Sequence, residues 1–338
     1  MKTSDMKRFD LIDFLKGYAI FTIVIYHLLN SLNYSGFFNK AIQFGGTGVH
    51  AFLLVSGFGL YLSFLQKPLA YGAFLKCRLS KVYIPYIIVV LFSALLTQFI
   101  PLFKSSWYAL GGHIFLYKMF DNSIIGSYGG HLWFISTIIQ FYLVFHVLAW
   151  MKKRTSNKIF LLLGLIISIA WGIFISLLGK SELRSWNSFF LQYLWEFMLG
   201  MIIAHLVATN KLKFSFKNWH FLLLALICIP LYALLALKAG SIGKIFNDIP
   251  ALIGYLAIAI FIYKLNISLI NKFFLHSAGI SYAFFLIHIL INTLIINLSK
   301  SAHLPVTLLT ITLSFLTSYA FAHIYNYLIK KIYRFSNI

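Results

Sequence analysis

The chain has 338 residues, of which 61% are hydrophobic and only 10% are charged. Soluble domains carry about 25% charged residues, so this composition excludes an ordinary soluble protein and indicates a polytopic membrane protein. The net charge of +21 does not indicate a nucleic-acid-binding protein, because the basic residues are scattered in short segments between apolar runs and form no compact basic domain. In a membrane protein such an excess predicts topology instead.

Apolar runs long enough to cross a bilayer recur along the whole chain. A spanning helix needs about 20 mostly apolar residues, and the pattern predicts about ten such spans. The fold class is therefore an all-α integral membrane protein, a bundle of about ten transmembrane helices. The spans are expected at residues 10–31, 45–66, 83–103, 132–151, 159–178, 189–208, 219–238, 249–264, 277–298 and 305–329.

Two further segments need an interpretation. The N-terminus starts basic, as a signal peptide does, but its apolar run is too long and no convincing cleavage site follows, so we interpret it as a retained first span. The region from Trp107 to His131 is apolar but broken by glycines, and we expect an interfacial or re-entrant loop there.

The distribution of lysine and arginine predicts the orientation of the spans. Ten spans with the N-terminus inside put 19 of the 28 basic residues on one side and 8 on the other, with Lys16 inside the first span. The positive-inside rule then places both termini in the cytoplasm. We expect one transmembrane domain over residues 1–338, with no appended soluble domain. Cys77 and Cys228 form no ligand spacing, so neither a disulfide nor a metal site is expected.

Three ionisable residues lie in the first span, in the stretch DFLKGYAIFTIVIYH. Lys16 and His27 are eleven residues apart, which in a helix puts them on one face about 16 Å apart. Asp13 lies one turn before Lys16 and can pair with it. Ionisable residues within a span indicate a functional site. The alternative is that Lys16 and His27 snorkel to the headgroups at either surface.

The second span and the loop after it contain small and basic residues. The glycines and Ser56 of GGTGVHAFLLVSGFGLYL are typical of close helix packing. The loop LKCRLSKVYIPY puts Arg78 and Lys81 three residues apart, just before Pro85 opens the third span. Basic residues in loops mostly set topology, but an arginine at a helix start can also hold a phosphate, because its guanidinium fork matches phosphate oxygens.

Polar residues of the later spans are candidates for substrate binding. A tryptophan at the mouth of a span is ordinary interfacial behaviour. The one acid well inside a span costs a few kcal/mol unless it is paired or protonated. The stretch HSAGISYAFFLIH adds a Ser-Tyr pair and a second intramembrane histidine. The candidates are His131, Trp133, Glu196, Ser281, Tyr282 and His288.

Five of these stretches, DFLKGYAIFTIVIYH, FLLVSGF, RLSKVYIPY, HLWFI and GISYAFFLIH, resemble the successive signatures of the transmembrane acyltransferase-3 family, in family order. The resemblance implies a membrane acyltransferase that moves an acyl group, most often acetyl, from acyl-CoA to a hydroxyl of a cell-surface polysaccharide or lipid-linked glycan. His27 matches the family's essential histidine and Arg78 its conserved arginine. Lys16 stands where arginine is usual, which keeps the charge but loses the bidentate fork.

The resemblance also implies the partners and the location. The partners are acyl-CoA (acetyl-CoA as donor), a glycan acceptor, membrane lipids and other glycan-biosynthesis proteins. No nucleic acid and no metal are expected, on the charge distribution and cysteine spacing described above. The location is the cytoplasmic membrane, and the Lys, Asn and Ile usage suggests a bacterial source. Because no secreted transferase domain is expected, the chain either transfers the acyl group directly or hands it to a separate protein.

These observations combine into one expected mechanism. His27 is the catalytic base, with Lys16 and Asp13 at the cytoplasmic entrance; Arg78, Lys81, Ser56 and Gly57 bind the CoA donor. Ser56 or Trp133 is a candidate oxyanion donor. Direct transfer is favoured over an acyl-enzyme, because no serine lies in a nucleophile-elbow motif.

The alternative function is that of a transporter or a flippase for a glycan or lipid-linked substrate. The intramembrane Lys, His and Glu would then carry substrate or protons. We see no inverted repeat and no matched pair of broken helices that would favour it.

Overall fold

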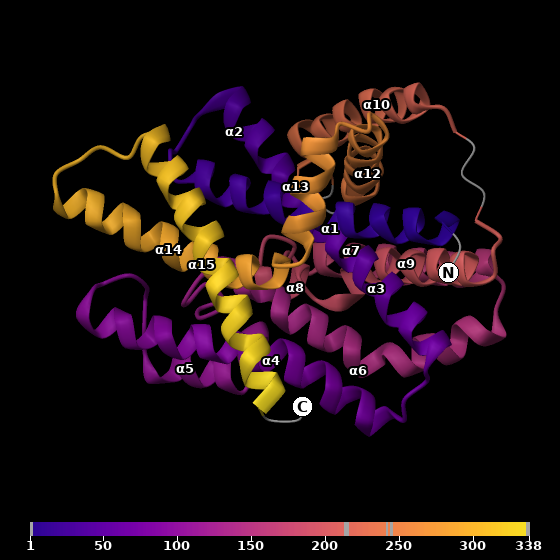
Figure 1. Cartoon of the computed structure of the whole chain (residues 1–338), viewed down its shortest axis with the longest axis horizontal. Coiled ribbons are helices and arrows are strands. Elements are labelled where there is room, and N and C mark those ends of the chain that lie inside the picture. The colour runs from indigo at the N-terminus through magenta and orange to yellow at the C-terminus, as the bar shows by residue number, and fades with distance from the viewer. Residues whose placement is uncertain (1–2, 213–215, 241–242, 244–245, 336–338) are drawn as a thin grey trace. The chain divides into compact units, whose positions relative to one another are not determined.

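The computed structural model describes residues 3–212, 216–240, 243 and 246–335, and no strand occurs among them (Figure 1). Lipid offers the backbone no hydrogen-bond partners, so apolar segments form helices that satisfy their own N–H and C=O groups. The α-helices are α1 (Thr3–Asn30), α2 (Gly36–Gln43), α3 (Gly48–Gln66), α4 (Tyr71–Phe99), α5 (Trp107–Ile114), α6 (Trp133–Arg154), α7 (Asn157–Leu177), α8 (Arg184–Asn187), α9 (Leu194–Ala208), α10 (Asn218–Lys238), α12 (Asp248–Lys264), α13 (Ser268–Ala278), α14 (Ser281–Ser301) and α15 (Leu308–Phe335). The 3-10 helices are η1 (Phe44–Thr47), η2 (Tyr117–Phe120), η3 (Gly130–Leu132) and η4 (Phe190–Tyr193).

The all-helical prediction is confirmed, and nine helices in the described part of the chain are long and apolar enough to cross a membrane. The eighth predicted span, α12, forms at its expected place but has 17 residues. That corresponds to about 26 Å of helix, against a hydrocarbon core of about 30 Å. The region between Trp107 and His131 contains only the short helices α5, η2 and η3, so it is no eleventh span. The cytoplasmic position of both termini stays a prediction.

Two predicted boundaries are wrong. Residues 71–82 were expected to form a loop before Pro85, but α4 runs through them and Pro85 lies inside the helix. A single proline removes only one backbone hydrogen bond, which membrane helices tolerate. The ninth span was expected to begin at residue 277, but the chain breaks after α13 and α14 starts at Ser281.

The described residues fall into two compact units, each built from three separate stretches of chain. Unit 1 consists of Met1–Phe21, Thr47–Tyr71 and Gln140–Gly279, and unit 2 of Thr22–Gly46, Gly72–Ile139 and Ile280–Ile338. The prediction of a single domain over residues 1–338 stays a prediction.

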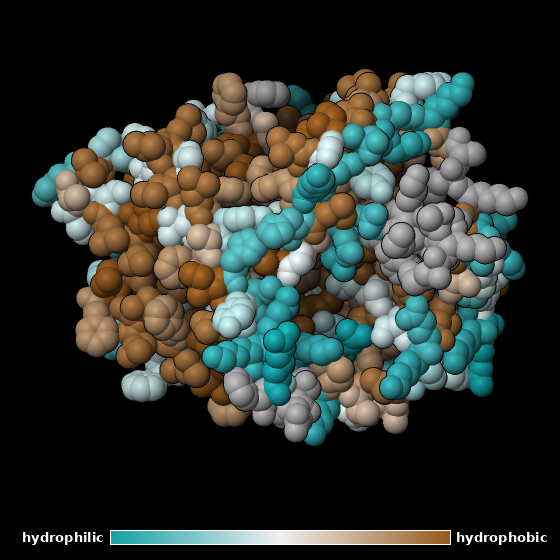
Figure 2. All heavy atoms as spheres, viewed as in Figure 1, coloured by the Kyte–Doolittle hydropathy of each residue, from teal (hydrophilic) through white to brown (hydrophobic). Residues whose placement is uncertain are grey.

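Each unit has its own aromatic and aliphatic core. In unit 1, Phe141 and Phe197 stack with ring centroids 4.3 Å apart, and both are fully buried. In unit 2, Phe284 packs edge-on against Phe315 and Tyr319. Large apolar side chains remain exposed along α15, among them Leu308, Leu309, Leu313 and Leu316. Apolar residues cover much of the surface of Figure 2 where α14 and the first half of α15 lie, as expected of helices that contact lipid.

Glycines bring the backbones of α3 and α9 into contact in unit 1. A Cβ added at Gly57 would lie 2.1 Å from the carbonyl oxygen of Phe197, and one at Gly200 would lie 1.9 Å from that of Leu54. Only glycine leaves room for such an approach, and membrane helices use small residues in this way. The helix-packing interpretation of the glycines in the second span is therefore confirmed at Gly57.

We predict that Gly57→Val and Gly200→Val each lower the thermal unfolding temperature and the yield of folded protein in detergent. Overpacking costs about 1–3 kcal/mol where side chains can adjust, and here the opposing atoms are backbone. Gly59→Val is the matched control, because nothing lies within 4 Å of its added Cβ. An unchanged unfolding temperature for Gly57→Val, measured by size-exclusion chromatography after heating, contradicts this packing.

Candidate functional site

Three histidines from three distant parts of the sequence meet in unit 2. His27 lies near the end of α1, His131 in η3, and His288 in α14. Their ring centroids are 4.8 Å apart for His131 and His288, 5.2 Å for His27 and His288, and 6.1 Å for His27 and His131. The predicted base and two of the predicted substrate-binding residues therefore form one cluster, here called the three-histidine site.

The backbone of α14 determines which nitrogen of His288 carries the proton. Its Nδ1 lies 3.0 Å from the carbonyl oxygen of Phe284 and 2.8 Å from that of Phe285. Carbonyl oxygens only accept hydrogen bonds, so Nδ1 is the protonated nitrogen of the neutral ring. Nε2 is buried and has no hydrogen-bond partner among the described residues. His288 thus presents an unprotonated nitrogen at the three-histidine site.

His131 is held by a backbone conformation that requires glycine. Its side chain is buried, and neither ring nitrogen has a hydrogen-bond partner in the described part of the chain. Gly129, two residues earlier, has φ +122°, a value that side-chain-bearing residues rarely adopt. A Cβ there would also lie 2.8 Å from Cε1 of His131. Glycine at this position therefore lets the chain turn back and place the imidazole beside α14.

A polar pair joins Ser31, the first residue after α1, to α14. Asn292 donates a hydrogen bond to Oγ of Ser31 (2.9 Å). Asn292 follows His288 by four residues, and Ser31 follows His27 by four residues. Asn292 and His288 therefore share a face of α14, and Oγ of Ser31 also lies 3.5 Å from the carbonyl oxygen of His27, so the pair holds the end of α1 beside this part of α14.

A buried lysine lies behind His131. Lys118 is fully buried, and its Nζ donates to the carbonyl oxygen of Leu132 (3.0 Å), the residue after His131. Its ammonium group also lies 5.5 Å from the ring centroid of Tyr86. Burial lowers the pKa of Lys118 from 10.5 to about 7. A titratable cation is therefore built into the support of the three-histidine site.

A hydrogen-bonded chain surrounds this lysine in unit 2. The hydroxyl of Tyr86 lies 2.8 Å from Nδ1 of His113, and Nε2 of His113 lies 2.9 Å from Oγ of Ser127. The Ser127 hydroxyl donates to a carbonyl oxygen, so it accepts from Nε2–H of the histidine. Burial, and after it the charge of Lys118, lowers the pKa of His113 to about 2. His113 is therefore neutral at every physiological pH.

The predicted entrance residues are paired as expected. Nζ of Lys16 lies 3.0 Å from Oδ1 of Asp13, and both side chains are partly exposed. Arg78 and Lys81 lie in the first turns of α4, with the Arg78 guanidinium 5.9 Å from the ring centroid of Phe74. Their predicted roles in donor binding stay predictions.

The other predicted site residues differ in their surroundings. Tyr282 donates its hydroxyl hydrogen to the carbonyl oxygen of Val82 in α4, a contact that anchors the start of α14. Ser281, the first residue of α14, and Trp133, the first residue of α6, are both buried in unit 2. In unit 1, Ser56 is half-buried beside Gly57 in α3. Their roles in binding also stay predictions.

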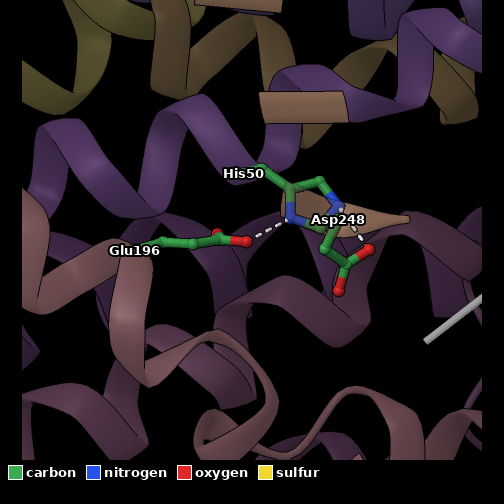
Figure 3. Close-up of side chains that lie close together, drawn as sticks. All are labelled: His50, Glu196 and Asp248. Carbon is green, nitrogen blue, oxygen red and sulfur yellow. Dashed lines mark hydrogen bonds and ion pairs between the residues drawn. The ribbon is translucent and has the colours of Figure 1, made fainter. Parts of the chain in front are cut away.

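Glu196 lies in a second ionisable cluster, which is in unit 1. Its side chain is fully buried, and Oε1 lies 2.6 Å from Nδ1 of His50 at the start of α3. Nε2 of His50 faces Oδ1 of Asp248, the first residue of α12, at 3.6 Å. Figure 3 shows the imidazole between the two carboxylates. Of the two alternatives for this buried acid, pairing or protonation, the structure shows a partner, His50; the predicted role of Glu196 in substrate binding stays a prediction.

The sequence reading passed over Lys118, His50 and Asp248. Lys118 was counted only as a basic residue of an outer loop, although a lone cation in the apolar stretch HIFLYKMF is a signal of burial. His50 stands among the glycines of the second span, and Asp248 precedes the short eighth span. Nothing in the spacing of His50, Glu196 and Asp248 joins them, because α3, α9 and α12 are brought together only by folding.

Comparison with known proteins gives one match. A family model described as an acyltransferase domain matches residues 9–325, which is nearly the whole chain. No curated protein and no solved structure matches the chain.

We predict that the thermal stability of the protein rises with pH between about 7 and 10.5 because of Lys118. The pKa of this lysine is about 7 in the folded protein and ordinarily 10.5, so the unfolded chain binds more protons in this window and stability increases with pH. The contribution is lost as pH falls through 7. The stability contribution of His113 changes with pH between its folded pKa of about 2 and its ordinary 6.5. This range lies below that of Lys118, so His113 does not affect the measured slope.

The measurement is the unfolding temperature in detergent at pH 7, 8 and 9 for the wild type and Lys118→Met. Methionine retains most of the buried length without the charge. The difference in slope between the two proteins isolates the lysine from all other titrating groups. Parallel pH profiles would show that Lys118 is not the group that titrates.

Proposed function

Because the chain belongs to the acyltransferase-3 family and is a membrane acyltransferase, we propose that it transfers an acetyl or similar acyl group from acyl-CoA to a hydroxyl of a cell-surface polysaccharide or lipid-linked glycan. His27 is the proposed base. The observation that carries the proposal is the convergence of His27, His131 and His288, in a site where the last two are buried. The proposed location is the bacterial cytoplasmic membrane.

The chemistry needs a group that accepts a proton near neutral pH. The acceptor hydroxyl gives its proton to a neutral nitrogen of His27 while its oxygen attacks the thioester carbon. The carbon–sulfur bond then breaks, and the CoA sulfur takes the proton as the thiol leaves. Histidine is the most common residue for this task, and its contribution is about 10²–10⁴-fold.

His288 and His131 are suited to hold the acceptor. The unprotonated Nε2 of His288 can accept a hydrogen bond from a sugar hydroxyl, as can an unprotonated nitrogen of His131. Both rings are buried and supported from behind, by the carbonyl oxygens of α14 and by Gly129. Rigid support of this kind keeps reacting groups in the geometry that transfer requires.

The donor is proposed to bind through the basic residues at the start of α4. Arg78 and Lys81 are three residues apart and so share one helix face, where they offer two cationic groups to the phosphates of CoA. α1 is a single uninterrupted helix, so Lys16 and His27 are separated by about 16 Å of helix rise. That length is on the order of an extended pantetheine arm.

We predict that His27→Ala lowers acyl transfer by about 10²–10⁴-fold, the range expected for loss of a general base. The measurement is the transfer of labelled acetyl from acetyl-CoA to glycan by purified protein that has been reconstituted into membranes. His303→Asn is the control, because His303 is exposed and its φ of +55° suits asparagine. Transfer at the wild-type rate by His27→Ala contradicts the assignment. If the wild-type protein moved glycan across the membrane without attaching labelled acetyl to it, the transporter alternative would be favoured.

We predict that Arg78→Gln raises KM for acetyl-CoA about tenfold or more with a smaller change in kcat, because the residue is proposed to bind a phosphate and not the reacting atoms. Charge-assisted bonds contribute about 1.5–3 kcal/mol. The effect should shrink as ionic strength rises, since salt screens exposed charges. Lys272→Gln, a change at another basic residue, serves as the control. An unchanged KM for Arg78→Gln removes this residue from the donor site.

A further inference from the structure

The second ionisable cluster has the form of a metal site. We propose that His50 and Asp248 bind a divalent transition-metal cation, for which Zn²⁺ fits best, with Glu196 orienting the histidine. The cation would join the first turn of α3 to the start of α12 and, through Glu196, to α9. The proposal concerns unit 1 alone and does not depend on the acyl-transfer chemistry.

The distance between the two proposed ligands is the first argument. Nε2 of His50 lies 3.6 Å from Oδ1 of Asp248, which is too long for a hydrogen bond. A protonated imidazolium would donate from Nε2 and draw the carboxylate to about 2.8 Å. Zinc bonds of about 2.0–2.2 Å at a tetrahedral angle separate nitrogen and oxygen by roughly 3.4 Å. The observed gap matches the separation of two ligands of one ion.

The partners of both ligands are the second argument. Nδ1 of His50 lies 2.6 Å from Oε1 of Glu196, so a neutral His50 that donates from Nδ1 to the carboxylate keeps the lone pair of Nε2 for a metal. The other oxygen of Asp248, Oδ2, accepts a hydrogen bond from the side-chain amide of Gln192 (3.1 Å). Metal-binding histidines almost always donate their second N–H to a carboxylate or carbonyl, and metal-binding carboxylates are hydrogen-bonded in turn.

The charge of the cluster is the third argument. Two carboxylates lie against one imidazole here, among side chains that are 15% exposed or less, so any uncompensated negative charge of the cluster is buried. Burying such charge is costly unless it is compensated. A divalent cation cancels it. The remaining oxygen of Glu196, Oε2, is buried without a hydrogen-bond partner among the described residues, as expected of a carboxylate stabilised by nearby positive charge.

There is also room beside the proposed ligands. A cavity of about 20 Å³ in unit 1 is lined by Asp248, Gln192 and Ser168, among others. One water needs about 10–15 Å³. Water in this cavity can reach a cation from the side of Asp248, which lines it. A nitrogen ligand favours zinc over calcium or magnesium, which prefer oxygen.

The competing arrangement is an imidazolium between the two carboxylates, with no metal. The cluster would then keep one negative charge, which the exposed Arg184 of the same unit could balance from the surface. This arrangement predicts no metal binding, so a metal titration separates the two.

The experiment uses the full chain in detergent, stripped with EDTA and then titrated with ZnCl₂ alone. Bound zinc is counted by mass spectrometry, and the unfolding temperature is followed in parallel. We expect one zinc per wild-type chain and a higher unfolding temperature when zinc is bound, with no response to CaCl₂. Asp248→Asn and His50→Ala should abolish binding. Glu196→Gln should weaken it about 10–100-fold, the usual effect of losing such a partner.

Glu182→Gln, a change at an exposed acid of the same unit, is the control and should bind like the wild type. No bound zinc on the folded wild-type protein would overturn the proposal, whatever the variants do. Equal binding by the wild type and Asp248→Asn, an isosteric change, would also overturn it. Acyl transfer is measured separately, so failure here leaves the proposed function intact, and failure of transfer leaves this site intact.

Discussion

The scarcity of water around apolar helices is the constraint on which the structure depends. A polar or charged side chain in such surroundings needs a partner from the protein, because the lipid provides none. Lys16 pairs with Asp13, Glu196 with His50, and Nδ1 of His288 with carbonyl oxygens of its own helix. These pairings determine which nitrogens and oxygens are left available for chemistry.

The three-histidine site follows from that constraint. Because Nδ1 of His288 donates to carbonyl oxygens of α14, its Nε2 is unprotonated and can only accept a hydrogen bond or a proton. Lys118 uses the carbonyl oxygen next to His131, and Gly129 provides the backbone turn that positions this imidazole. The unprotonated Nε2 of His288 therefore suits the hydroxyl substrate proposed for this protein, because it can accept a hydrogen bond.

The two ionisable clusters differ in the charge that their buried side chains can carry. The three-histidine site contains no acid among the residues that form it, so its imidazoles can remain neutral. In unit 1, two carboxylates face one imidazole, which contacts both of them. The sequence expectation of no metal rested on cysteine spacing, which says nothing about carboxylate and histidine ligands contributed by three separate helices.

The sequence by itself determined the helical class, the position of nearly every span and the family, because apolar length and local motifs are properties of continuous segments. It also singled out His27, His131, His288 and Glu196. Only the tertiary structure decided which of these meet, that Lys118 is buried, and that His50 and Asp248 flank one another. Such contacts join residues up to 261 positions apart, as Asn292 and Ser31 do. Helix packing creates these long-range contacts, and a local pattern of residues does not predict which helices pack together.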